Sequence, residues 1–305
     1  MKRTTRTALA LIGCLCTTGC SAAAFVEAPN RGLRIDPARD PGPLCLSLLG
    51  VDRQFRIRSE PENASLRVWV MEPAGHRPPR GTVFVLHGYR NGMFWQLPNG
   101  RLFARRGFRV VLTDLRGHGR STGDWIGYGA LESQDMVRVL DELKRRQLVA
   151  GRIGVWGFSM GGATAIQWAG RDKRIEAVVA VAPFASMKDI VAHESHRRSL
   201  GLAGVDSEAQ LESLLRQATE GKGYRPEEAD TAAAARRTRA PILIVHGMWD
   251  QINPLEQSRR ILKDAPRGSR LIAIPGLGHV TIQFHNPAMC RQIPAWFETH
   301  LASSP

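Results

Sequence analysis

Residues 153–162 read IGVWGFSMGG, an apolar run followed by a serine between glycines. The apolar run from Ile153 to Trp156 is typical of a buried strand, and a helical stretch begins at Gly161 and Gly162. Between them, residues 157–161 match the pattern G-x-S-x-G, whose flanking glycines allow a sharp turn that pushes a serine hydroxyl outward. The pattern alone is weak evidence, because it is short. Its position between a predicted strand and a predicted helix makes it informative. We therefore predict that Ser159 is a nucleophile.

A serine nucleophile needs a general base, and that base needs a carboxylate to fix its tautomer. Asp250 follows the apolar run 242–245, and His279 follows the run 271–274. Both residues are therefore expected on loops at the carboxyl ends of strands, where Ser159 is also expected. His285 is the closest rival for the base, but it falls where a final helix approaches. Asp114 is the rival for the acid, but it precedes Ser159 and is better explained by structural hydrogen bonding in its own turn.

An acyl-transfer site also needs N–H donors aimed at the developing oxyanion. The backbone N–H of Met160, directly after the nucleophile, is the first candidate. The second is the N–H of Tyr89, in the loop that follows the strand predicted at 82–86. His87 in the same loop is predicted to be a packing residue.

Apolar runs alternate with helical patterns along the chain, which predicts an α/β fold with a mostly parallel sheet covered by helices on both faces. A hairpin at 54–58 and 66–71 opens the domain, and the segment 185–239 interrupts the alternation as a small helical lid, with a helix at 207–219. Further strands are predicted at 82–86, 109–113, 153–156, 177–181, 242–245 and 271–274, and helices at 97–106, 131–147, 162–170, 255–263 and 287–301.

From about residue 54 onward the chain resembles the α/β-hydrolase superfamily, in the esterase, lipase and serine aminopeptidase-like group. The matching stretches are 86–88 (LHG), 114–121 (DLRGHGRS), 157–162 (GFSMGG), 246–250 (HGMWD) and 278–279 (GH). The resemblance implies an acyl-serine intermediate that water hydrolyses, with no metal and no organic cofactor. Cleavage of small-molecule carboxylic esters or thioesters is the expected function. Alternatives are a peptidase or amidase of the same group, and a non-catalytic binding lipoprotein that keeps the fold.

The first twenty residues have the layout of an export signal, with basic residues, an apolar run from Ala8 to Cys16 and small residues before Cys20. The sequence 17–20 (TTGC) resembles a bacterial lipoprotein processing site, with Thr17 where Leu or Val is usual. Cys20 is the expected lipidated residue, with Cys14 or a plain cleaved signal as alternatives. The sequence thus predicts an exported, periplasmic or cell-envelope protein held to the membrane by a lipid. Residues 1–19 form the signal, 20–50 an extended tether and 51–305 the hydrolase domain.

The chain carries a formal net charge of +14, which by itself would suit an anionic partner. Its arginines are scattered rather than clustered and accompany no zinc-finger or RNA-binding motif, so no nucleic-acid partner is predicted. Cys45 and Cys290 remain outside the signal, either as a disulfide pair or as two separate thiols.

Overall fold

The computed structural model describes residues 26–31, 36, 40–61, 63–75, 78–198, 207–283 and 288–302, with the backbone alone at 197, 198, 288 and 289. The strands are β1 Arg53–Ser59, β2 Ala64–Met71, β3 Thr82–Leu86, β4 Arg109–Thr113, β5 Ile153–Phe158, β6 Ile175–Val181, β7 Ile242–Gly247 and β8 Arg270–Ile274. The α-helices are α1 Pro43–Leu49, α2 Leu97–Arg105, α3 Ala130–Arg145, α4 Met160–Arg171, α5 Met187–Arg198, α6 Glu208–Thr219, α7 Thr231–Arg237, α8 Leu255–Lys263 and α9 Ile293–His300. Single turns are η3 Met93–Gln96, η4 Pro226–Glu228, η5 Thr281–Gln283 and the π-helical η6 Ala288–Gln292.

The strands form one eight-stranded sheet in the order β1-β2-β4-β3-β5-β6-β7-β8. The hairpin β1–β2 joins β4 in antiparallel orientation, whereas the pairs from β4 through to β8 are parallel. The mostly parallel sheet predicted from the sequence is therefore confirmed. Because β5 lies between β3 and β6, the loop that follows it is flanked by the loops of its neighbours at the same edge.

The central strands are buried on both faces, which explains their continuous apolar sequences. In β3, Phe84 and Leu86 face one side of the sheet, and Val83 and Val85 face the other. Phe84 meets the indole of Trp168 from α4 edge to face at 4.9 Å between ring centroids. A polar or charged side chain at these positions would be buried without water to hydrogen-bond it, which would destabilise the fold.

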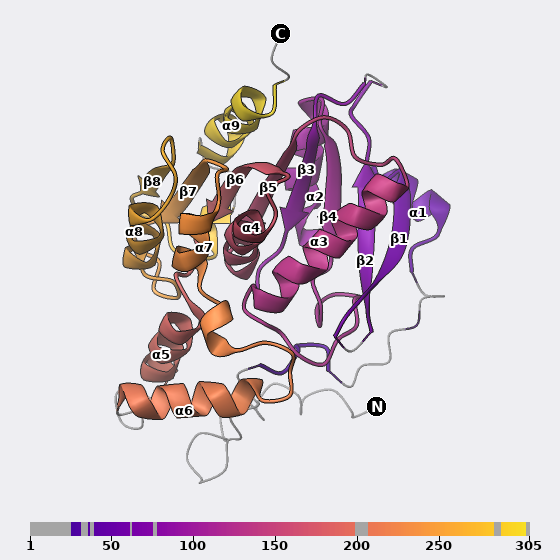
Figure 1. Cartoon of the computed structure of the whole chain (residues 1–305). Helices are drawn as coiled ribbons and strands as arrows, with labels where there is room; N and C mark the ends of the chain where they lie inside the picture. Colours follow the sequence, from indigo (N-terminus) through magenta and orange to yellow (C-terminus); the bar gives the residue numbers. More distant parts are fainter. Residues whose placement is uncertain are drawn as a thin grey trace, which may run out of the picture.

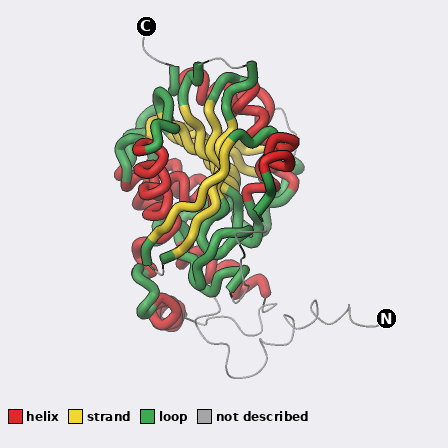
Figure 2. The backbone as a smooth tube through the Cα atoms, turned by 90° about the vertical axis from the view of Figure 1, so that its right-hand side faces the viewer, coloured by secondary structure: helices red, strands yellow, loops and turns green. Residues whose placement is uncertain are grey.

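Helices cover both faces of the sheet (Figures 1 and 2). Helices α3, α4, α7 and α8 contribute to one hydrophobic core, and α1, α2 and α9 contribute to the other. On the second face α9 packs closely, since a Cβ on Gly154 of β5 would come within 2.6 Å of the Phe297 ring.

The segment 185–239 separates into two parts. Helices α5 and α6 extend beyond the sheet, below the carboxyl ends of its parallel strands in Figure 1. Helix α7, in contrast, packs against α4 on the face of the sheet, and the Gly170 backbone approaches Ala234 so closely that a Cβ would lie 2.6 Å from its carbonyl oxygen. The lid-like part of the insert is thus α5 and α6, and its last helix belongs to the covering layer.

Parts of the stretch expected to be an extended tether lie against the domain. Val26 and Ala28 are buried in the first core, and Ile126 donates a backbone hydrogen bond of 2.8 Å to the Val26 carbonyl. Asp40 forms ion pairs with Arg56 and Arg120, the second at 2.7 Å. These contacts join residues distant in sequence, so the local composition of the segment does not reveal them.

Cys45 and Cys290 are both free thiols, and Cys45 is exposed. No helix within the described ranges combines the length and the apolar character needed to cross a bilayer.

Candidate active site

Ser159 lies in the tight turn between β5 and α4, where its backbone adopts φ 53° and ψ −117°. This left-handed conformation is unfavourable for a residue with a side chain and persists only where the surroundings enforce it. A 2.8 Å hydrogen bond from the Ser159 N–H to the Val181 carbonyl of β6 holds the turn. This backbone conformation keeps the hydroxyl at the carboxyl edge of the sheet, before the first turn of α4.

The glycines on both sides of Ser159 are required by close backbone contacts. A Cβ on Gly157 would lie 2.1 Å from the Gly161 carbonyl oxygen, and one on Gly161 would lie 2.5 Å from the carbonyl oxygens of Leu86 and His87. Larger residues at either position would force the elbow open and displace the serine.

The structure brings the three residues predicted as a triad into one hydrogen-bonded chain. The Ser159 hydroxyl lies 2.9 Å from His279 Nε2, and His279 Nδ1 lies 2.7 Å from Asp250 Oδ2. Asp250 follows β7 and His279 follows β8, so each side chain comes from a separate strand end. With Nδ1–H donated to the carboxylate, Nε2 is free to accept the serine proton, which is the arrangement that generates an alkoxide-like nucleophile.

The Asp250 carboxylate is buried and fully engaged. Oδ1 accepts backbone N–H groups from Ile252 at 2.9 Å and Asn253 at 2.8 Å. Burial raises its pKa, but hydrogen bonds from His246 and His279 outweigh that effect and lower the pKa to about 2. The group therefore remains an anion near neutral pH, as the orienting partner of a histidine must.

His246 is a second histidine on this carboxylate, and the sequence analysis missed it. Its Nε2 lies 3.2 Å from Asp250 Oδ2 and 2.7 Å from the Asn253 carbonyl oxygen, to which it donates. Its Nδ1 accepts from the Ser258 hydroxyl at 2.6 Å. The signal was present in the four-residue spacing between His246 and Asp250 at the end of a strand, where a turn brings the two side chains back together.

His246→Ala is expected to lower kcat/KM by roughly 10- to 100-fold, since a hydrogen bond to a charged group contributes about 1.5–3 kcal/mol. The loss arises because Asp250 would hold His279 less firmly. Ester turnover at a temperature where circular dichroism shows the variant folded gives the measurement. His300→Ala, in α9 on another side of the sheet, is the control, and equal rates in the two variants would contradict the role given to His246.

Two backbone N–H groups belong to the segments next to Ser159. Met160 is the first residue of α4, so its N–H has no partner within the helix. The loop with Tyr89 runs alongside, because a Cβ on Gly88 would lie 3.2 Å from Ser159 Cβ. In the described part of the chain, neither the Met160 N–H nor the Tyr89 N–H donates to another protein group. The oxyanion role predicted for both groups from the sequence stays a prediction.

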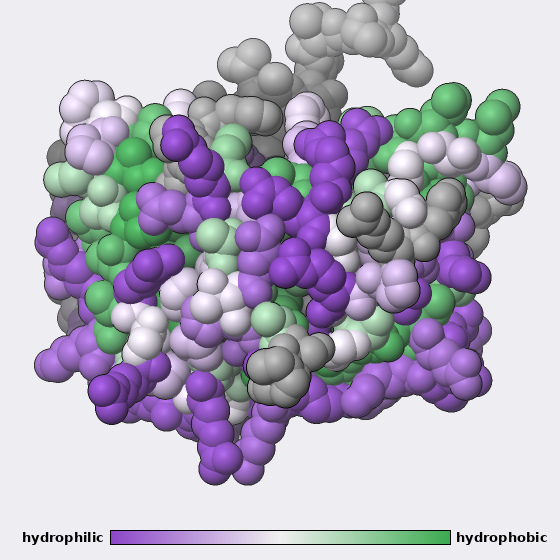
Figure 3. Space-filling model, turned by 90° about the horizontal axis from the view of Figure 1, so that it is seen from above, coloured by the Kyte–Doolittle hydropathy of each residue, from purple (hydrophilic) through white to green (hydrophobic). Residues whose placement is uncertain are grey.

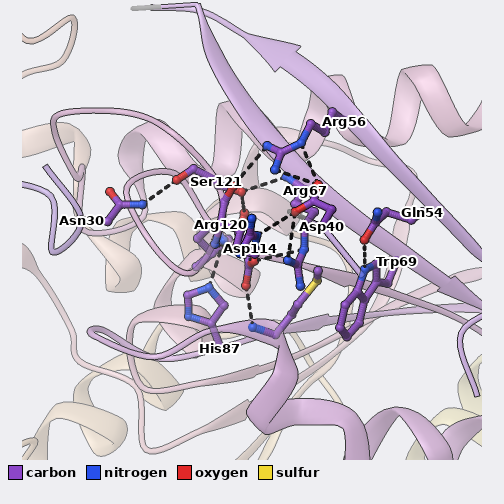
Figure 4. A network of polar contacts seen from close by, with 12 residues as sticks. Asn30, Asp40, Gln54, Arg56, Arg67, Trp69, His87, Asp114, Arg120 and Ser121 are labelled. Atoms are coloured by element: carbon purple, nitrogen blue, oxygen red, sulfur yellow. Dashed lines mark hydrogen bonds and ion pairs between the residues drawn. The ribbon is translucent and has the colours of Figure 1, made fainter. Parts of the chain in front are cut away.

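His87 fixes the peptide that carries the Tyr89 N–H. Its Nδ1 lies 2.8 Å from the Gly88 carbonyl oxygen, and its Nε2 accepts the Leu115 N–H at 2.9 Å. Asp114 supports the same loop by accepting the Met93 N–H at 2.7 Å, and it accepts the Arg120 N–H of its own turn at 2.9 Å (Figure 4). The structure thus gives Asp114 and His87 the hydrogen-bonding and packing roles expected from the sequence.

Acid is expected to destabilise the fold through His87. Desolvation by burial lowers its pKa from 6.5 to about 4, so as the pH falls from 6.5 to 4 the unfolded chain takes up a proton that the folded chain does not. The contribution lost over this window is about 3 kcal/mol. Asp250 does not oppose it, because its pKa is lowered from 3.8 to about 2, and its own contribution is lost only below that window.

The comparison with His87→Gln isolates this effect, because glutamine can accept the Leu115 N–H but does not titrate. Urea unfolding gives the free energy of unfolding of each protein at pH 7 and at pH 4. Subtracting the change in the variant from the change in the parent removes the contribution of groups present in both, such as Asp114, whose pKa burial raises. Parallel pH dependence of the two proteins would contradict the assignment.

The remaining predicted residues can be placed briefly. Cys20, Cys14 and His285 lie outside the described residues. Within the described ranges, no group of three or more histidine, cysteine, aspartate or glutamate side chains is placed to hold a metal ion. A cavity of about 810 Å³ opens between α1, the β1–β2 hairpin and α2, and none of its lining residues belongs to the loops of Ser159, Asp250 or His279.

A parallel sheet with Ser159 at a β5–α4 elbow, and Asp250 and His279 at later strand ends, defines an α/β hydrolase, and the chain is a hydrolase of this superfamily. A family model described as X-Pro dipeptidyl-peptidase (S15 family) matches residues 62–234, more than half of the chain, and the chain belongs to this family. The matched range contains Ser159 but ends before Asp250 and His279.

The chain is also similar to several known proteins. The uncharacterized protein YqkD of Bacillus subtilis is 29% identical over 217 residues, which cover 69% of this chain and 68% of the relative. The bifunctional esterase/perhydrolase DCH of Acinetobacter calcoaceticus is 27% identical over 216 residues, which cover 58% of this chain and 77% of the relative. The esterase Pf2001 of Pyrococcus furiosus superposes with a TM-score of 0.66 at 21% identity, covering 88% of this chain and 98% of its own, and shows the shared fold.

Proposed function

We propose that the protein is a serine hydrolase that cleaves carboxylic esters or thioesters through an acyl-serine intermediate. The observation that carries the proposal is the hydrogen-bonded chain from Ser159 through His279 to the buried anion of Asp250. His279 Nε2 takes the serine proton as Oγ attacks the acyl carbon, and it returns that proton to the leaving alkoxide or thiolate. The N–H groups of Tyr89 and Met160 bind the oxyanion of each tetrahedral intermediate, and water then attacks the acyl-serine by the same route.

The charge of the loops that follow β3, β6, β7 and β8 supports an uncharged acyl group. The loops at 87–96, 182–186, 246–254 and 275–283 contain no carboxylate apart from Asp250, whose oxygens are already occupied. A free peptide amino terminus is a cation and would need an acidic partner close to Ser159. The relative in Acinetobacter calcoaceticus whose name includes esterase favours the same substrate class.

Removal of a dipeptide from a free amino terminus is the second candidate, because the family model over residues 62–234 is that of X-Pro dipeptidyl-peptidases. The same triad can cleave an amide once His279 protonates the leaving nitrogen. The two candidates differ in what must be recognised rather than in the attacking group.

A substrate panel separates the candidates. Ethyl butyrate and S-ethyl thiobutyrate, which lack an activated leaving group, are compared with Ala-Pro-p-nitroanilide, whose leaving group is activated in favour of amide cleavage. We expect kcat/KM for both butyrates to exceed that for the anilide. Faster cleavage of the anilide would select the peptidase, and no turnover of any substrate by folded protein would point to a binding protein without catalysis.

We also propose that the chain is exported and anchored through a lipid on Cys20, on the strength of the basic, apolar and small-residue layout of residues 1–20. Metabolic labelling with a radioactive fatty acid in a bacterial host tests this proposal. Cys20→Ser is expected to abolish the label, whereas Cys14→Ser keeps it. Loss of label only in Cys14→Ser would move the anchor, and no label in the parent would leave a plain cleaved signal.

A further inference from the structure

The exposed hydrophobic side chains are concentrated on three loops at the carboxyl edge of the sheet. Of the eight large hydrophobic residues exposed within the described ranges, six lie on the loops that follow β3, β7 and β8. We call these six the catalytic rim: Tyr89, Phe94, Trp95, Met248, Trp249 and Val280. The other two are Leu44 and Leu48 on α1.

The catalytic rim surrounds the triad from both sides. Tyr89, Phe94 and Trp95 follow β3, one strand before β5 in the sheet, whereas Met248 and Trp249 follow β7 on the other side. Trp249 adjoins Asp250 and Val280 adjoins His279 in the sequence. The two later loops are joined to each other, since Trp249 N–H donates to the Leu277 carbonyl at 2.9 Å.

The exposure of these side chains is large. Trp95 and Trp249 are each 70% exposed, and Phe94 is 54% exposed. Tryptophan and tyrosine favour the boundary between water and lipid, where the ring is buried while its polar atom stays hydrated. A group of aromatic and aliphatic side chains around a catalytic serine is therefore suited to a lipid surface.

The described chain begins on the side of the molecule where the lid helices lie. Glu27 bridges to Trp125, and the Lys222 ammonium lies 3.5 Å from the Trp125 ring, in the connection between α6 and η4. Tyr224 of the same connection donates to the Ile126 carbonyl at 2.9 Å. Figure 1 shows this first segment, in indigo, close to α6 and below the sheet.

The reach of the chain before Val26 limits where an anchor can be. Val26 is the sixth residue after Cys20, and an extended chain of that length spans at most about 20 Å. A lipid on Cys20 would therefore hold the membrane on the side of α6 and the carboxyl edge. Figure 3 shows the face at the top of Figure 1, on the side away from α6, and this face is hydrophilic over much of its middle.

The charge of the chain fits an anionic membrane. The net charge is +14 for the whole chain and +11 without residues 1–19, which carry three basic and no acidic residues, and Arg90 lies beside the Tyr89 ring, with its guanidinium carbon 5.8 Å from the ring centroid. Basic side chains near aromatic residues add electrostatic attraction to the burial of apolar area at an anionic bilayer.

We propose that the catalytic rim docks on the surface of an anionic lipid bilayer, with Ser159 facing the lipid. The substrate then reaches the triad from the membrane side. Docking does not depend on turnover, so it can fail while the ester hydrolase proposal holds, and the reverse is also true.

Co-sedimentation with vesicles of phosphatidylcholine and 30% phosphatidylglycerol tests the proposal. The full chain with Cys20→Ser is used, so that no lipid on that residue holds the protein to the vesicle. The double variant Trp95→Gln/Trp249→Gln is expected to bind the vesicles at least about tenfold more weakly than the parent. The matched control Leu44→Ser/Leu48→Ser, which removes the exposed apolar side chains of α1, is expected to bind like the parent.

Equal binding by the rim variant and the parent would overturn the proposal, because residues 1–19 alone would then account for binding. Absence of binding by the parent, or an equal loss in both double variants, would also overturn it. Self-association of the parent without vesicle binding, seen by sedimentation velocity, would assign the rim to a second copy of the chain.

A second measurement keeps the test valid if the polar rim variant does not fold. Lipids brominated on their acyl chains quench tryptophans that enter the bilayer. Quenching is expected to fall in Trp95→Phe and Trp249→Phe but not in Trp69→Phe, which removes an indole that is fully buried in β2. The same quenching in all three variants and the parent would contradict docking through the rim.

Discussion

Replacing Ser159 with alanine is expected to lower kcat/KM for p-nitrophenyl acetate by roughly 10⁵-fold or more, because the hydroxyl is the nucleophile and no acyl-serine can form without it. Any hydrolysis by the variant that exceeds the uncatalysed rate in water would come from the two N–H donors and from substrate binding. The fold should be unaffected, since the elbow is held by Gly157, Gly161 and the bond from the Ser159 N–H to Val181, all of which the variant keeps.

Steady-state kinetics with burst analysis measure this loss. Ser186→Ala is the matched control, because that serine also follows a sheet strand and its hydroxyl bonds Asp189 rather than a histidine. The control is expected to retain the parent rate. Substantial turnover by Ser159→Ala would remove Ser159 from the mechanism.

Asp250→Asn is expected to lower kcat by roughly 10⁴-fold. The asparagine oxygen would stay on the Ile252 and Asn253 N–H groups, which bond Oδ1 in the parent. Its amide nitrogen would then face His279 Nδ1, which lies 2.7 Å from Oδ2 in the parent. An amide N–H can donate a hydrogen bond to Nδ1 only when Nδ1 carries no proton. The proton moves to Nε2, which can no longer take the serine proton.

The pH dependence of kcat in Asp250→Asn tests this explanation. A higher pH should recover part of the rate, because hydroxide can remove the serine proton directly. Asp189→Asn, whose parent carboxylate pairs with Arg260 at 2.7 Å on the outside of the lid, is the control and should retain activity. An Asp250→Asn variant as active as the parent would show that another carboxylate orients His279.

Most of the fold follows from short apolar runs, because strands buried on both faces leave no room for polar residues. β3 and β4 occupy the predicted ranges 82–86 and 109–113 without change. The final helix is different, since the predicted range 287–301 contains a π-helical turn before α9. Pro294 explains the break, because its ring nitrogen has no N–H for the regular i to i−4 bond.

Sequence reasoning placed the three triad candidates at the ends of strands because G-x-S-x-G and the later loops are local patterns. Their hydrogen bonds came from the structure. His246 was missed since its role depends on the turn that brings it to Asp250 and on Ser258, twelve residues further on. Val26 was missed for a similar reason, because its partner Ile126 lies a hundred residues away and no periodicity links the two.

Labelling with a fluorophosphonate probe followed by peptide mapping tests whether Ser159 is an activated nucleophile. The probe forms a covalent bond only with an activated serine, and its position is read independently of the natural substrate. We expect a single modification on the peptide that contains Ser159, absent in Ser159→Ala and strongly reduced in Asp250→Asn. A folded wild-type protein that takes up no probe, or takes it up on another serine, would contradict the account.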